Sequence, residues 1–214
     1  MEILDSIRLS VIDGNMHETQ QLVQEALEEH VPAERILRDG LISAMTEVGN
    51  RFECGEFFIP EMLISARAMK SGLALLRPHL TAAHVQAIGK VVIGTVQGDL
   101  HDIGKNLVGM MLEGAGFEVI DLGADVSVDT YIDAVKEYRP DLVACSALLT
   151  TTMPRMAEII SSLKQAGLRE RVKVMVGGAP VTEEYASEIG ADGFAPDAAL
   201  AAACAKELMV GRGA

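Results

Sequence analysis

The chain has 214 residues, of which 49% are hydrophobic and 23% charged, and its formal net charge is −13. This length suffices for one large domain or two smaller ones. The acidic balance argues against nucleic-acid binding by charge and suits a soluble, cytoplasmic protein. No basic segment opens the sequence and no stretch reaches the roughly 18 apolar residues of a membrane span, so neither a secretory signal nor a membrane anchor is expected.

Apolar residues recur three and four positions apart through the first part of the chain, which is the pattern of amphipathic helices. It predicts four helices, over residues 3–11, 22–27, 36–48 and 62–76. Glycines and prolines stand at the breaks, as expected for helix ends and first turns. We therefore expect residues 1–85 to form a four-helix bundle that acts as a cap domain.

From residue 90 onward, strand-like apolar runs alternate with helical segments. The expected strands cover residues 91–96, 118–122, 142–147, 172–176 and 193–195. The first run is β-branched at every position except Gly94, which is typical of a strand buried on both faces. Short connections between strands and helices force parallel pairing. Residues 86–214 are thus predicted to form a flavodoxin-like (Rossmann-type) α/β domain with a five-stranded parallel sheet in the order 2-1-3-4-5.

Polar residues and glycines follow three of these strands. Asp99 and His101 come after the first strand, Ser146 ends the third, and Gly177 and Gly178 follow the fourth. In a sheet of this order, ligands bind beyond the carboxyl ends, at the switch point between strands one and three. A carboxylate that accepts the imidazole N–H fixes the tautomer and raises the basicity of the other nitrogen, which suits a single metal ligand.

Each of these features also has a structural explanation. Asp99 could cap the following helix, His101 could be an exposed loop residue, and the glycines could form a tight turn. A Ser-His-Asp hydrolase is disfavoured because Ser146 lies in an apolar strand without the flanking glycines of a nucleophile elbow. A closed zinc site is disfavoured because His101 has no further ligands at suitable spacing.

The cysteines do not supply a site either. Cys54, Cys145 and Cys204 stand at unrelated spacings without a CxxC pair, so neither a disulfide framework nor a zinc knuckle is indicated. Cys145 is better explained as a small core residue than as a nucleophile. A metal at His101 must therefore bring its own ligands, as the cobalt of a macrocyclic cofactor does.

The residues from Asp99 to Gly104 read Asp-x-His-x-x-Gly, and Ser-x-Leu follows after 41 residues and Gly-Gly after 28 more. This pattern resembles the cobalamin-binding signature, and residues 90–205 look like the corrinoid-binding domain of methyltransferases. Residues 48–70 are similar to the helical cap that precedes this domain in methionine synthase. The whole chain resembles the free-standing corrinoid proteins of the methylamine, methanol and methoxyarene methyltransferase systems, and most closely the methylamine proteins.

The resemblance implies that the chain binds cobalamin or a related corrinoid base-off, with His101 as the lower axial cobalt ligand. Asp99 and Ser146 would complete a proton relay with it. The apolar residues Phe57, Phe58, Ile59, Met62 and Leu63 could cap the cobalt, and equally could be ordinary bundle core. The residues implied to contact the cofactor are Gly98, Asp99, His101, Asp102, Ile103, Gly104, Ser146, Leu148, Thr150, Gly177 and Gly178.

The function implied is that of a methyl carrier without an attached catalytic barrel. A substrate:corrinoid methyltransferase would load the methyl group as methyl-Co(III), a corrinoid:carrier methyltransferase would remove it, and a reductive activation protein would restore the cobalt. Three alternatives stay open. A cobalamin-dependent regulator would need an effector domain, a subunit of an adenosylcobalamin mutase would not need the helical cap, and a receiver domain would need clustered acids after the first strand.

Overall fold

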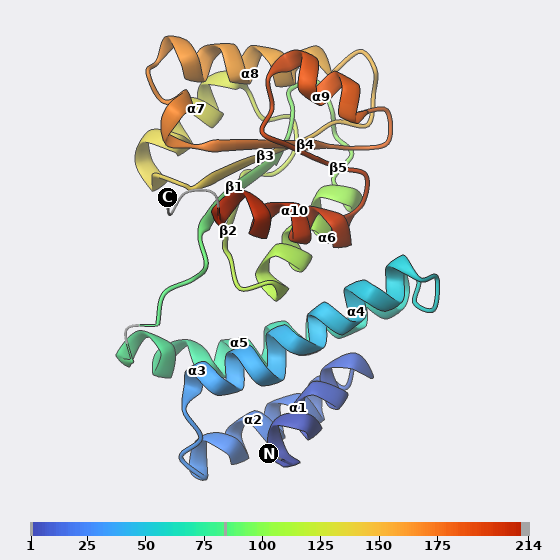
Figure 1. Cartoon of the computed structure of the whole chain (residues 1–214), viewed down its shortest axis with the longest axis vertical. Helices are drawn as coiled ribbons and strands as arrows, with labels where there is room; N and C mark the ends of the chain where they lie inside the picture. The colour runs from blue at the N-terminus through green and yellow to red at the C-terminus, as the bar shows by residue number, and fades with distance from the viewer. Residues whose placement is uncertain (1, 84, 211–214) are drawn as a thin grey trace. The chain divides into compact units, whose positions relative to one another are not determined.

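The computed structural model describes residues 2–83 and 85–210 (Figure 1). The chain divides into two compact units, one formed by Met1–Ala87 with Glu113–Gly116 and the other by Ile88–Leu112 with Phe117–Ala214. Within the described ranges, no helix combines the length and the apolar character that crossing a membrane requires.

The first unit is built from helices. They are α1 (Glu2–Ile12), α2 (Met16–Glu28), α3 (Ala33–Arg35), the π-helical segment η1 (Ile36–Ile42), α4 (Ser43–Glu53) and α5 (Ile59–Ala82). Because α3, η1 and α4 follow one another without a break, the described residues form four helical stretches. The helical cap predicted from the apolar spacing is confirmed.

Local signals set the helix ends. The side chain of Asn15 accepts a hydrogen bond from the Glu18 N–H at 3.2 Å and so caps α2. Pro60 lies in the first turn of α5, where its missing N–H would have no helical partner in any case. This helix continues past Pro78 to Ala82 and is longer than the apolar spacing indicated, because one proline removes only one hydrogen bond of the helix.

The second unit is a parallel α/β sheet. Its strands are β1 (Lys90–Thr95), β2 (Glu118–Asp121), β3 (Leu142–Ser146), β4 (Lys173–Gly177) and β5 (Gly193–Ala195). Its helices are α6 (Ile103–Gly114), α7 (Val128–Tyr138), α8 (Pro154–Gln165), α9 (Glu183–Ile189) and α10 (Ala198–Val210), with a short 3₁₀ turn η2 at Arg169–Arg171. The strand order is β2-β1-β3-β4-β5 and every pair is parallel, as predicted.

Helices cover both faces of this sheet: α7, α8 and α9 lie on one face, and α6 and α10 on the other (Figure 1). Val92, Val143 and Val174 of the central strands are fully buried in the core beneath α7 and α8. The register pairs Thr95 with Ser146, and Ser146 with Gly177. The carboxyl ends of β1, β3 and β4 are therefore level, and the loops that follow them share one edge.

Candidate functional site

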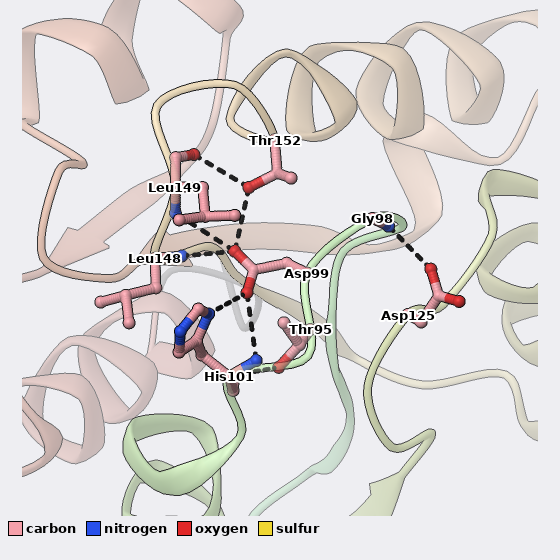
Figure 2. Close-up of polar contacts among 8 residues, drawn as sticks. All are labelled: Thr95, Gly98, Asp99, His101, Asp125, Leu148, Leu149 and Thr152. Carbon is pink, nitrogen blue, oxygen red and sulfur yellow. Dashed lines mark hydrogen bonds and ion pairs between the residues drawn. The ribbon is translucent and has the colours of Figure 1, made fainter.

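A buried carboxylate joins the loop after β1 to the turn after β3 (Figure 2). The Oδ1 atom of Asp99 accepts hydrogen bonds from the His101 backbone N–H at 3.1 Å and lies 2.7 Å from His101 Nδ1. Its Oδ2 atom accepts from the Leu148 N–H at 2.7 Å, the Leu149 N–H at 3.2 Å and the Thr152 hydroxyl at 2.9 Å. The side chain of Asp99 has no exposed surface.

These donors determine the charge of Asp99. Burial raises the pKa of its carboxyl group, but the hydrogen bonds from Leu148, His101 and Thr152 outweigh burial and hold the pKa well below its ordinary value. The carboxylate is therefore ionised at neutral pH. A fixed negative charge lies directly behind the imidazole of His101.

The imidazole of His101 is held from one side and open on the other. Its side chain is 52% exposed although its Nδ1 atom contacts the buried carboxylate. The backbone carbonyl of His101 accepts a hydrogen bond from the buried Thr95 hydroxyl at 3.0 Å. When Nδ1 carries the proton and donates it to Asp99, the lone pair of Nε2 remains for a ligand.

A second loop clamps the residues before His101. The N–H of Asp125 donates to the Asp99 carbonyl at 3.0 Å. The carboxylate of Asp125 accepts from the Gly98 N–H at 2.7 Å (Figure 2). Gly98 has φ +84° and Asp125 has φ +55°, so both adopt the left-handed conformation. The loop between β2 and α7 thereby fixes the position of Asp99.

Two glycines, Gly177 and Gly178, stand at the carboxyl end of β4. Gly178 has φ +125°, and a Cβ atom there would collide with the carbonyl oxygen of Ala147. A Cβ atom at Gly177 would lie 2.8 Å from the Ala195 carbonyl oxygen. The backbones of β4, Ala147 and Ala195 therefore approach one another so closely here that neither position accommodates a side chain.

Large apolar side chains are exposed at two places near this site. Some are close to His101 in the sequence, and one lies in the turn after β3. Leu100 is 75% exposed, Ile103 is 73% exposed and Leu148 is 43% exposed. Exposed apolar groups next to a fixed polar group are typical of a ligand-facing surface. A macrocycle that holds a metal at its centre fits this combination.

The predicted relay partner Ser146 occupies a different position from the hydroxyl that contacts Asp99. Ser146 ends β3 and is half-buried, and no hydrogen bond between described residues joins its hydroxyl to Asp99. Thr152 supplies the hydroxyl instead. The part of Ser146 in a relay stays a prediction.

Sequence reasoning missed Thr152, Thr95 and Asp125. Thr152 is the last of three consecutive threonines, and nothing in the sequence pattern distinguishes it from the other two. Thr95 lies at the end of a strand whose other residues are apolar except for Lys90 and Gly94, which was a usable signal.

The other predicted contact residues lie at the start of α6 and in the turn after β3. The side chain of Asp102 accepts a hydrogen bond from the Asn106 amide at 3.1 Å, so this carboxylate supports the first turn of α6. Gly104 is exposed, and a Cβ atom there would meet nothing within 4 Å. Thr150 is exposed as well.

The residues predicted to cap the cobalt belong to the helical unit and differ in exposure. Phe58 is 63% exposed and Ile59 is 45% exposed, whereas Phe57 and Leu63 are half-buried and Met62 is buried. Their role as a cap stays a prediction.

The donor set fits a metal that arrives with its own ligands. Across the part of the chain that the structure describes, no three His, Cys, Asp or Glu side chains gather in a way that could hold a metal ion. His101 offers one ring nitrogen as a donor, in a stretch of the chain that also carries the exposed side chains of Leu100 and Ile103. These residues fit cobalamin, whose cobalt can take one nitrogen ligand from the protein.

Comparison with known proteins agrees with this geometry. Residues 89–203 match a family model described as a B12 binding domain, and residues 3–77 match a second model of the same description. The chain is 45% identical over 210 residues to dimethylamine corrinoid protein 3 of Methanosarcina acetivorans, covering 93% of this chain and 99% of that one. It is 41% identical over 210 residues to the trimethylamine corrinoid protein of Methanosarcina barkeri, covering 97% of each chain.

A solved structure shows the same fold. The chain is similar to the crystal structure of the methanol:cobalamin methyltransferase complex MtaBC from Methanosarcina barkeri, with a TM-score of 0.88 and 29% identity over 98% of this chain and 80% of that chain. The similarity therefore extends over both the helical unit and the α/β unit. The chain belongs to the B12-binding corrinoid proteins of the methylamine and methanol methyltransferase systems.

Proposed function

We propose that this protein carries a methyl group on a bound corrinoid between two methyltransferases of a methylamine-type system. The observation that carries the proposal is the pair formed by buried Asp99 and exposed His101, with Nδ1 and Oδ1 separated by 2.7 Å. The similarity to dimethylamine and trimethylamine corrinoid proteins supports the methylamine class. When bound, cobalamin would supply the cobalt atom that holds the methyl group.

In this proposal the chain binds the cofactor base-off, with His101 Nε2 as the lower ligand in place of the cofactor's own base. Asp99 keeps the proton of the imidazole on Nδ1, so that Nε2 presents its lone pair. The negative charge of Asp99 makes the imidazole a stronger donor. Because five hydrogen bonds hold this carboxylate, the imidazole would be presented to a bound corrinoid in one orientation.

The remaining contacts divide between two regions. At the start of α6, Leu100 and Ile103 would face the ring, with Gly98, Asp102 and Gly104 beside them. Toward β3 and β4, the nucleotide tail would pass Ser146, Leu148, Thr150, Gly177 and Gly178. Gly177 is paired in register with Ser146, so these two residues would lie together along this path.

The helical unit would shield the upper side of the cofactor. Phe58 and Ile59 are the exposed members of the predicted cap, at the start of α5, and they are the side chains we expect to face the ligand together with Phe57, Met62 and Leu63. Such a cap must move when a partner enzyme reaches the cobalt.

Three partners follow from a carrier role. A substrate:corrinoid methyltransferase loads the methyl group, a corrinoid:carrier methyltransferase removes it, and a reductive activation protein restores a cobalt that has been oxidised. The structural similarity to the methanol:cobalamin methyltransferase complex supports the first of these partners. The chain itself would bind and position, while its partners supply the substrate specificity.

The test is reconstitution under anaerobic conditions with hydroxocobalamin. The wild type should retain the corrinoid through gel filtration and show the spectrum of a His-ligated, base-off cobalamin. His101→Ala should lose that spectrum, whereas His17→Ala, which changes an exposed histidine of the helical unit, should keep it. The proposal would be contradicted if the wild type retained no corrinoid, or if the spectrum of His101→Ala were identical to that of the wild type.

The methyl donor is tested separately. The loaded protein should accept methyl groups when mixed with a dimethylamine or a trimethylamine methyltransferase and the matching amine. The amine that gives the faster methylation identifies the substrate class. No methylation with any methylamine would remove the methylamine assignment and leave corrinoid binding intact.

A further inference from the structure

We infer that Lys105, a buried lysine of α6, is a positioning residue for His101, and this inference rests on the proposed role of His101 as the lower ligand. The side chain of Lys105 is 1% exposed, and its ammonium group forms an ion pair with the carboxylate of Asp121. Burying an ammonium group costs its hydration, and pairing offsets that cost only in part, so such a pair adds little net stability. Its place four residues after His101 points instead to a role in holding the chain there.

The ammonium group of Lys105 also holds the first turn of α6. It donates to the side-chain oxygen of Asn106 at 2.6 Å, and the Asn106 amide donates to the carboxylate of Asp102 at 3.1 Å. Asp102 directly follows His101 in the chain. The contacts of Lys105 therefore reach the residue next to the proposed ligand.

A second set of contacts runs from Asp121 back to His101. The Oδ1 atom of Asp121 accepts the Gly123 N–H at 2.8 Å, and the Gly123 carbonyl accepts the Thr95 N–H at 2.9 Å. The Thr95 hydroxyl in turn donates to the His101 carbonyl at 3.0 Å (Figure 2). Together with the contacts of α6, these bonds form a closed chain that begins and ends at the peptide between His101 and Asp102.

The sheet fixes one side of this closed chain. Residues 118–121 of β2 pair with residues 90–93 of β1, so the backbone of Asp121 is held in the register of the sheet. Lys105 passes this fixed position on to the first turn of α6, because its ammonium group contacts both Asp121 and Asn106. Without the ammonium group the turn loses its tie to β2, and the His101 backbone can shift with it.

Lys105→Met tests this inference, because it removes the ammonium group and keeps an apolar chain in the buried space. Lys90→Met is the matched control. Lys90 pairs with Glu118 at the amino ends of β1 and β2, the opposite end of the two strands that the Lys105 contacts join. Asp121→Asn breaks the ion pair of Lys105 from its exposed side and replaces Lys105→Met if that variant does not fold.

The first measurement needs no corrinoid and follows amide hydrogen exchange by NMR. The backbone N–H of His101 donates to Asp99 Oδ1, so it should exchange slowly in the wild type and in Lys90→Met. In Lys105→Met its exchange should be about tenfold faster, because the turn that carries it is less firmly held.

The Leu148 N–H serves as the internal reference for that exchange. It donates to the other carboxylate oxygen of Asp99 from the turn after β3, and its exchange rate should be the same in all three proteins. An unchanged His101 rate in Lys105→Met would overturn the inference. Equal acceleration at His101 and Leu148 would overturn it as well, because that result indicates a general loss of stability.

The second measurement uses the loaded protein reduced to the cobalt(II) state. The nitrogen hyperfine splitting of its electron paramagnetic resonance spectrum reports imidazole coordination. We expect the equilibrium constant for imidazole coordination to fall about tenfold in Lys105→Met and to keep its wild-type value in Lys90→Met. Equal constants in the wild type and Lys105→Met would contradict a positioning role. Failure of the wild type itself to show imidazole coordination would instead count against the proposed function, while the exchange rates still decide whether Lys105 holds the backbone of His101.

Discussion

The ammonium group of Lys105 forms an ion pair with the carboxylate of Asp121, and the two partners differ sharply in exposure. Only 1% of the lysine side chain is exposed, against 47% of the aspartate side chain. Lys105 lies in the first turn of α6, and Asp121 ends β2. The pair therefore ties the helix that begins two residues after His101 to the edge of the sheet.

This asymmetry predicts unequal effects of removing either partner. Asp121→Ala leaves a buried ammonium group with the Asn106 side chain as its remaining partner, which should destabilise the protein by about 3 kcal/mol. Lys105→Met fills the same space with an apolar chain and leaves a carboxylate that water can solvate, so its effect should be clearly smaller. Urea unfolding of both variants measures the difference. Equal losses, or a larger loss for Lys105→Met, would contradict the prediction.

Gly178 should not tolerate a side chain. In Gly178→Ala the new Cβ atom meets the Ala147 carbonyl, and the backbone at φ +125° disfavours any L-residue, so strands β3 and β4 must separate locally. We expect a loss of about 2–3 kcal/mol in the free energy of unfolding and weaker retention of corrinoid. Gly190→Ala is the control, because φ there is +78° and a Cβ atom meets nothing within 4 Å. In the control, the free energy of unfolding should fall by only about 1 kcal/mol, which is the cost of placing an alanine in the left-handed conformation.

Thiol reactivity should separate the three cysteines. Cys54 is exposed, Cys204 is half-buried and Cys145 is buried. Burial raises the pKa of the Cys145 thiol to about 12, so almost none of it is thiolate at about pH 8. Iodoacetamide followed by mass spectrometry should label Cys54 first and Cys145 only when the protein unfolds. Labelling of Cys145 at the rate of Cys54 would show that β3 is not buried as described.

The same thiol predicts a loss of stability at alkaline pH. In the unfolded chain Cys145 ionises around its ordinary pKa of 9.0, whereas the folded protein holds the proton until about pH 12. Its contribution to stability is therefore complete below pH 9.0 and is lost as the pH rises toward 12. Between about pH 9 and 10 this thiol should lower the free energy of unfolding by up to about 1.4 kcal/mol per pH unit.

Two substitutions check that slope. Cys145→Ala should flatten the dependence of unfolding free energy on pH in this window, and Cys54→Ala should leave it unchanged, because Cys54 is exposed. The buried Tyr131 phenol, whose ordinary pKa of 10.0 burial also raises, adds a further loss only at higher pH. A slope that survives Cys145→Ala would assign the alkaline loss to other groups.

Much of the architecture could be predicted from the sequence because its causes are local. Apolar spacing of three and four predicts the helices of the first unit, and β-branched runs such as Val91–Ile93 predict strands covered on both faces. Parallel pairing follows from the lengths of the connections, and these facts together lead to the order β2-β1-β3-β4-β5. The placement of Asp99 and His101 after β1 follows from the same pattern.

The hydroxyl on Asp99 required the tertiary structure. A strand position such as Ser146 can be assigned from its neighbours, but the turn after β3 has no repeating geometry that tells which of Thr150, Thr151 and Thr152 faces the carboxylate. That choice is made by where the turn brings the Leu148 and Leu149 N–H groups, 49 and 50 residues away from Asp99 along the chain. The kinds of residue at the ends of the strands, an acid, an imidazole and a pair of glycines, can be predicted from the order of residues along the chain. Which donors satisfy the buried charge depends on contacts between distant loops, and only the folded chain decides those.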